Sequence, residues 1–168
     1  MSTAIEKRSA NIQLEPDSEA PSSYEVDFYA WTRRQAALLR EGRFGDLDIE
    51  NVIEEIEALG RSEKRELESR LRVLLTHLLK WQFQAEQHER YGRSWLATIR
   101  NQRTELRKLI RDNPSLKTGL NATLGEAYQD ARYVAEAETG LSIRTFPEDF
   151  PYTIDKVLDA EWMPMAPS

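Results

Sequence analysis

Two histidines are the side chains in this sequence whose chemistry could support catalysis or metal binding. Four residues fall at four-, three- and four-residue spacing on one face of a helix: His77, Trp81, Gln84 and His88. A histidine beside carboxylates can act as a general base or bind a divalent metal ion. A di-iron bundle, however, requires a glutamate three residues before each histidine, and neither histidine has one. We therefore expect no metal and no cofactor, and an enzyme centred on His77 is only the third functional hypothesis.

Polar residues elsewhere could extend this face into a site. Glu50, Glu54 and Glu57 share a helical face and could supply oxygen ligands, but the helix dipole explains acids in the first turns of a helix equally well. Gln102 lies on the inward line of its own helix, and a buried amide needs hydrogen-bond partners, which we expect on the histidine face. The candidate polar cluster is therefore His77, Trp81, Gln84 and Gln102.

A basic stripe offers a second chemistry, the binding of phosphates. Between Arg90 and Arg111 seven lysines and arginines accompany only one acid, Glu105. Four of them share a helical face: Arg100, Arg103, Arg107 and Arg111. Such a stripe is the electrostatic signature of nucleic-acid binding, although no known nucleic-acid motif surrounds it. The alternative, which the sequence favours, is pairing with the acidic segment from Asp48 to Glu68.

The composition limits the classes of protein to which this chain can belong. The sequence of 168 residues has a net charge of −6 and no cysteine, so disulfides, thiolate catalysis and cysteine-bound metals are excluded. It contains no run of about 18 apolar residues and no pattern typical of a signal peptide, so we expect a cytoplasmic protein without a membrane segment. Residues 1–22 are rich in Ser, Ala, Pro and charge, which predicts a disordered tail before one domain at residues 23–164.

The candidate residues depend on one long helix for their positions. An apolar stripe repeats every three or four residues: Leu67, Leu71, Leu74, Leu78 and Trp81. The same phase continues upstream through Gly60, which predicts a single helix from Asp48 to Glu86, with a kink at Gly60 as the alternative. A glycine on this inward line would allow a neighbouring backbone to approach closely. The upstream residues expected to point inward are Ile49, Val52, Ile53, Ile56 and Leu59.

Start and stop signals predict the remaining helices. The expected limits are Ser22 or Ser23 to Gly42, Ser94 to Asn113, Asn113-Pro114 to Gly140, and a short helix Ile154–Asp159 capped by Thr153. Glycines and alanines give the helix from Asn113-Pro114 to Gly140, the fourth in the chain, a small-residue face suited to close packing. No segment alternates like a strand, so we expect an all-α protein. Its architecture would be an antiparallel helical bundle of four main helices around the long one, with short C-terminal helical turns.

Several motifs together resemble one protein family. They are Tyr24–Thr32 (YEVDFYAWT), Leu47–Ile56 (LDIENVIEEI), His77–Gln82 (HLLKWQ), Ser94-Trp95 with Thr98-Ile99 and Gln102-Arg103, and Phe150–Thr153 (FPYT) with Val157-Leu158. Across Tyr24 to Pro164 the sequence resembles the bacterial domain-of-unknown-function family 29, which is abundant in cyanobacteria. The resemblance implies an all-helical fold and brings no established activity and no catalytic residue.

The long helix, its interior glycine and the lack of a recognised catalytic motif favour a non-enzymatic function. We expect a protein-interaction or self-associating module whose partner is another protein or a second copy of the chain. The contact would use the apolar or small-residue faces of the long and fourth helices. Nucleic-acid binding through the basic helix at residues 94–111 is the alternative, and the enzyme centred on His77 comes third.

Overall fold

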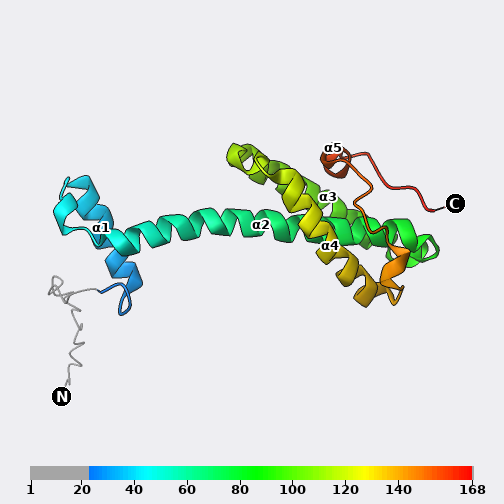
Figure 1. The fold of residues 1–168 in the computed structure, drawn as a ribbon, viewed down its shortest axis with the longest axis horizontal. Coiled ribbons are helices and arrows are strands. Elements are labelled where there is room, and N and C mark those ends of the chain that lie inside the picture. The colour runs from blue at the N-terminus through cyan, green and yellow to red at the C-terminus, as the bar shows by residue number, and fades with distance from the viewer. Residues whose placement is uncertain (1–22, 168) are drawn as a thin grey trace, which may run out of the picture. The chain divides into compact units, whose positions relative to one another are not determined.

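The computed structural model describes residues 23–167, and every regular element in that range is helical. Five α-helices follow one another (Figure 1): α1 (Phe28–Arg40), α2 (Ile49–Phe83), α3 (His88–Asp112), α4 (Leu120–Thr139) and α5 (Ile154–Leu158). The predicted all-α class is therefore confirmed. The tail predicted for residues 1–22 lies outside the described residues.

The chain divides into two compact units by its internal contacts. The N-terminal unit ends at Ile56 and the C-terminal unit begins at Glu57. The N-terminal unit contains α1 and the first turns of α2, and the C-terminal unit contains the rest of α2 and the other three helices. That residues 23–164 fold as a single domain stays a prediction.

One hydrophobic core holds the C-terminal unit together. The second half of α2, α3, α4 and the segment after α4 all contribute to it, and Figure 1 shows α3 and α4 gathered around the second half of α2. The predicted leucine stripe is confirmed, because each of its leucines is at most 2 % exposed: Leu67, Leu71, Leu74 and Leu78. Trp81, at the end of the stripe, is partly buried at the edge of this core.

The helix α2 runs without interruption from Ile49 to Phe83, which confirms the prediction of one long helix through Gly60. It ends at Phe83 rather than at Glu86, and a 3-10 turn (Ala85–Gln87) then leads into α3. A Cβ atom at Gly60 would meet no atom of the described chain within 4 Å. The close backbone approach expected at Gly60 is therefore not found among residues 23–167.

The prediction that the first half of α2 points its apolar residues inward is wrong. Val52 is partly buried, but the other four residues are 50 to 68 % exposed: Ile49, Ile53, Ile56 and Leu59. The reason is that the segment around α1 contacts a different face of α2, the one that carries Asp48 and Glu55. Apolar periodicity identifies a face that needs covering, but it does not say what covers it.

Two predicted helix starts in the C-terminal unit are also wrong. α3 begins at His88 instead of Ser94, and Gly92 lies inside it, where a Cβ atom would sit 3.6 Å from Trp81 Cζ3. α4 begins at Leu120 instead of Pro114, because Pro114 opens only a short 3-10 turn. Gly119, with φ of 83°, separates that turn from α4.

The start of the first helix differs as well, whereas the predicted glycine ends of α1 and α4 are confirmed. α1 begins at Phe28 instead of Ser23, because Asp27 caps it by accepting a hydrogen bond from Ala30 N–H at 2.9 Å. Gly42 and Gly140 follow α1 and α4 with φ of 70° and 73°, a backbone region that favours glycine. The side chain of Thr153 caps α5 as predicted.

The small-residue face of α4 is used inside the chain. Three of its alanines are at most 4 % exposed and belong to the core: Ala127, Ala131 and Ala135. Small side chains allow helices to pack at short interaxial distances. This part of the predicted self-association surface is therefore covered by the protein's own helices.

We expect alanine substitutions at Gly60, inside α2, and at Gly140, after α4, to change the stability of the protein in opposite directions. Gly60→Ala should stabilise the protein by about 0.5–1 kcal/mol, because the site is helical and open, and alanine restricts the unfolded chain. Gly140→Ala should destabilise it by roughly 1–2 kcal/mol, because its φ of 73° is strained for any residue with a Cβ atom. Urea unfolding of both variants measures the two changes in the free energy of unfolding. Shifts of the same sign would contradict this account.

Candidate functional site

The N-terminal unit joins the segment around α1 to the start of α2, which α1 crosses steeply (Figure 1). Tyr24, before α1, donates its hydroxyl hydrogen to Glu55 Oε1 at 2.5 Å. Gln35, near the end of α1, accepts a hydrogen bond through Oε1 from the backbone N–H of Asp48 at 2.9 Å. These bonds tie the segment around α1 to Asp48 and to the first turns of α2. We call residues 23–56 the N-terminal hairpin.

Trp31 is the centre of the N-terminal hairpin. It is 3 % exposed, and its indole N–H donates to Asp48 Oδ2 at 3.1 Å. The side-chain amide of Asn51 donates to the same oxygen at 2.8 Å. These two donors, that of Asn51 first, lower the pKa of Asp48 against the opposing effect of desolvation. Phe28 stacks on Trp31 with ring centroids 5.7 Å apart, which completes the small aromatic cluster.

The outer surface of the N-terminal hairpin is strongly apolar. Of the twelve large hydrophobic residues that are exposed in the described chain, eight belong to this unit: Val26, Phe28, Tyr29, Leu39, Phe44, Ile49, Ile53 and Ile56. Scattered exposed apolar side chains are normal, but their concentration in one small unit is not. We call the part formed by Phe28 and Leu39 of α1 and by Ile49, Ile53 and Ile56 of α2 the hairpin face. It is the strongest candidate site in the described chain.

The predicted basic stripe is divided by the structure. Arg103 is 1 % exposed, and its guanidinium donates to the backbone oxygens of Val157 at 2.8 Å, Trp162 at 2.7 Å and Ala160 at 3.3 Å. Burial lowers the pKa of Arg103 below its ordinary value. Arginine suits this place because its planar fork can donate to several carbonyl oxygens at once. Arg103 thus anchors the C-terminal segment to α3.

The other three arginines of the stripe differ in their surroundings. Arg107 donates through Nε to the backbone oxygen of Leu158 at 2.9 Å, so it too holds the C-terminal segment. Arg111 pairs with its neighbour Asp112 at 3.1 Å on the surface, and Arg100 is exposed. For Arg103 and Arg107 the expected pairing with the acidic part of α2 is wrong. Their guanidinium groups donate to backbone carbonyls of the C-terminal segment instead.

The predicted polar cluster is not assembled as one group. The ring of His77 lies with Nδ1 2.9 Å from the backbone oxygen of Val73 in its own helix, so Nδ1 carries the proton and donates. Trp81 stacks on His88 with ring centroids 3.9 Å apart. Gln102 accepts a hydrogen bond from Arg70 at 3.4 Å rather than from the histidine face. Gln84 stands before the turn that leads into α3. His77, Trp81 and Gln102 thus have separate structural partners.

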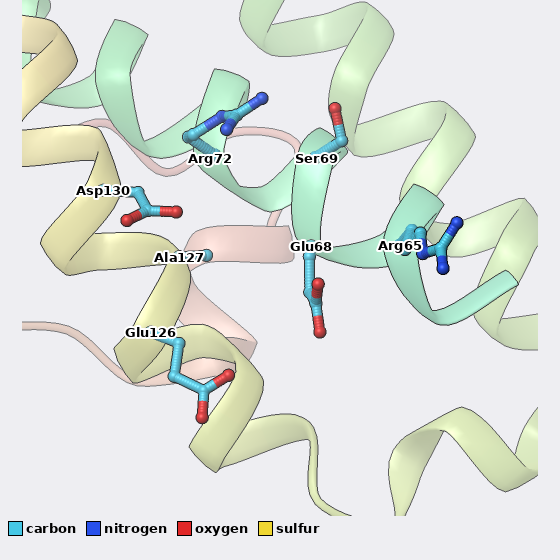
Figure 2. Close-up of a pocket in the computed structure, with 7 residues that line it drawn as sticks. All are labelled: Arg65, Glu68, Ser69, Arg72, Glu126, Ala127 and Asp130. Carbon is cyan, nitrogen blue, oxygen red and sulfur yellow. The ribbon is translucent and has the colours of Figure 1, made fainter. Parts of the chain in front are cut away.

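Two of the hollows in the surface are lined mainly by charged and polar side chains. One of about 230 Å³ lies between α2 and α4 and is drawn in Figure 2, lined by Arg65, Glu68, Ser69, Arg72, Glu126, Ala127 and Asp130. Its three acids and two arginines largely cancel in charge, so the hollow shows no strong preference for a charged ligand of either sign. The other hollow, of about 540 Å³, lies in the N-terminal hairpin beside Trp31 and Asp48, whose polar atoms already bond to each other.

The chain matches the model of a known protein family. Residues 23–163 match the family described as "Domain of unknown function DUF29". The chain belongs to this family. Comparison with curated proteins and with solved structures found no match. The DUF29 description assigns no activity, so the function of this DUF29 chain must be inferred from its own residues.

Two further features of the DUF29 chain concern chemistry and membranes. Within residues 23–167 no three or more His, Asp or Glu side chains are grouped so that they could hold a metal ion. In the same range no helix is both long enough and apolar enough to cross a membrane. The hairpin face is the candidate site that we consider further. Its apolar residues can be recognised in the sequence, but their exposure is seen only in the structure.

We expect the buried arginine of this DUF29 chain to be a major source of stability. Arg103→Met should cost roughly 3–5 kcal/mol, because it removes the donor of the buried carbonyl of Val157 and of the partly buried carbonyls of Ala160 and Trp162. Arg100→Met, on the exposed side of the same helix, should change stability by less than about 0.5 kcal/mol. Urea unfolding measures both, and limited proteolysis should cleave the segment after Pro151 faster only in the Arg103 variant. Equal stability of the two variants would refute the anchoring role.

We expect His77 to give the DUF29 chain a specific pH dependence. Burial lowers the pKa of His77 below its ordinary value in the folded protein. Between about pH 7 and pH 5 the unfolded chain therefore binds more protons at this position, so stability falls as pH falls. His77→Gln should reduce this loss. The measurement is urea unfolding of both proteins at several pH values, and parallel slopes would contradict the assignment.

Proposed function

We propose that this protein is a protein-interaction module of the bacterial cytoplasm and that the hairpin face is its binding surface. The observation that carries the proposal is the concentration of exposed large apolar residues, eight of twelve, in the N-terminal unit. A concentration of exposed apolar side chains is typical of surfaces that bind another protein. The site is a face and not a catalytic pocket.

The small core of the N-terminal hairpin supports the same proposal. Only two large apolar side chains of residues 23–56 are buried, Trp31 and Leu38. Structures of fewer than about 40 residues usually need a disulfide, a metal or a partner to be stable. The sequence has no cysteine. A partner that covers the hairpin face would supply the apolar burial that this unit lacks.

The position of the apolar residues suits a helical partner. Ile49, Ile53 and Ile56 follow one another at four- and three-residue spacing, the repeat that lets two helices pack along their length. Each of the three is 50 to 63 % exposed. Covering one such side chain contributes on the order of 1 kcal/mol at about 25 cal/mol per Å². Several together provide enough free energy for specific association.

The proposal is tested by changing the hairpin face and following complex formation. Ile53→Lys with Ile56→Lys should lower the yield of chemically cross-linked complexes, with itself or with other proteins of the source cell, at least tenfold. The change should not unfold the protein, because both side chains are exposed on a helix that accepts lysine well.

A matched control is Tyr133→Lys, which alters an exposed apolar residue on α4 that is 64 % exposed. This variant should form the same complexes as the unaltered protein. If no complex of any kind depends on Ile53 and Ile56, the proposed function is wrong. Helical circular dichroism verifies that the three proteins are equally folded.

A further inference from the structure

The outer face of α3 carries a line of exposed side chains that contains no acid. The line advances in steps of three and four residues, which keep side chains on one side of an α-helix. Its members are Arg90, Arg93, Ala97, Arg100, Thr104, Arg107 and Arg111. All seven are exposed to solvent. We call this line the arginine stripe.

The arginine stripe differs from the basic stripe expected from the sequence. Arg103 does not belong to it, because that side chain is buried and holds the C-terminal segment. Arg90 and Arg93 join it, because α3 begins at His88 and places them on the same helix as the later arginines. From Arg90 to Arg111 the stripe extends over about 31 Å at 1.5 Å per residue.

Most of the positive charge in the arginine stripe is not neutralised within the described chain. The ion pairs among residues 23–167 include only one of its arginines, Arg111, which pairs with Asp112. Arg107 donates to a backbone carbonyl, which carries no charge of its own. The other three arginines form no ion pair in that range. The guanidinium groups of the stripe can therefore meet an anion.

A hollow at the end of the arginine stripe adds another cation. It has a volume of about 310 Å³ and is lined by Arg107, Ile110, Arg111, Pro114, Lys117 and Leu158. None of these six residues is acidic, and the three without a charge are apolar, so no side-chain acceptor of the lining competes for an incoming anion. Three cations around one concave surface raise the local positive potential. The stripe and the hollow together form one continuous basic surface.

We propose that the arginine stripe binds the phosphate backbone of a nucleic-acid duplex without reading its sequence. All the basic residues of the stripe are arginines, whose planar fork can donate two parallel hydrogen bonds to one phosphate group. The length of the stripe is close to one turn of a duplex, about 34 Å, so several phosphates lie within reach. The stripe belongs to the C-terminal unit, and this inference does not depend on the hairpin face.

The surroundings of the arginine stripe favour nucleic acid over other polyanions. The centre of a protein interface is apolar, whereas only Ala97 and Thr104 stand between the arginines here. A helix that lies on a membrane inserts its apolar face into the lipid. The apolar face of α3 is instead buried in the core through Ile99, Leu106 and Ile110. A polar and strongly positive surface is typical of nucleic-acid binding.

The test measures the binding of labelled duplexes of about 30 base pairs and arbitrary sequence by fluorescence anisotropy at about 50 to 200 mM salt. One duplex is DNA and the other is RNA, because both present the same phosphates. The unaltered chain should bind at least one of them, with an affinity that falls as salt rises. Arg93→Gln with Arg100→Gln should weaken binding about tenfold or more at the lowest salt. It should also reduce the slope of log affinity against log salt by about two, because two phosphate contacts are lost.

A matched control removes the same charge from another exposed surface. Arg33→Gln with Arg34→Gln changes two exposed arginines of α1 and should leave the affinity within about twofold. Both variants keep residues that favour helix, and circular dichroism verifies their folding. Binding of DNA alone, of RNA alone or of both supports the inference and identifies the source of the phosphates.

Three results would overturn the inference. The first is that the unaltered chain binds neither duplex at the lowest salt. The second is that the α1 and α3 variants lose affinity equally, because attraction would then depend on overall charge and not on the arginine stripe. The third is that the chain binds vesicles of phosphatidylcholine and phosphatidylserine but no duplex. None of these results changes the expectation for the complexes that depend on Ile53 and Ile56.

Discussion

The leucine stripe in the second half of α2 is the interaction on which the C-terminal unit depends. Its four leucines are at most 2 % exposed, and α3, α4 and the C-terminal segment all reach the same core. Removing one such side chain to alanine typically costs about 2–5 kcal/mol. Even α5, which has only five residues and could not form alone, is held there by the fully buried Val157. Arg103 completes this attachment by bonding to the backbone carbonyls of the segment.

The first half of α2 obeys a different constraint. Its apolar residues continue the repeat that the leucines follow, yet those residues are exposed while the leucines are buried. A helix extended by packing at one end can remain helical at the other through local hydrogen bonds and capping alone. The exposed end then keeps its apolar face available. The same repeat is therefore buried in a core in one unit and exposed in the other.

The sequence was sufficient for the fold class, the continuity of α2 and the glycine helix ends, because these depend on local periodicity and backbone conformation. It was insufficient where a choice depended on distant contacts. Ser94 is a good helix cap, but the packing of Trp81 on Gly92 lets α3 begin earlier. Arg103 looked like one basic residue among four, and only the carbonyls of a segment more than fifty positions away explain its burial. The same limit applies to the candidate site. The spacing of Ile53 and Ile56 indicates an apolar helix face, but it does not indicate which part of the chain or which other molecule packs against that face.

Association and order are coupled in the N-terminal hairpin. Trp31 and Leu38 are its only large buried apolar residues, and a segment with so few buried apolar contacts opens more easily than a full core does. Any partner that binds only the closed form stabilises that form by mass action, in proportion to the logarithm of its concentration. If the partner is a second copy, the hairpin becomes more ordered as the protein becomes more concentrated. The exposed apolar residues of the hairpin face then have a physical role. Because they are covered only when the partner binds, they make the stability of the hairpin depend on that partner.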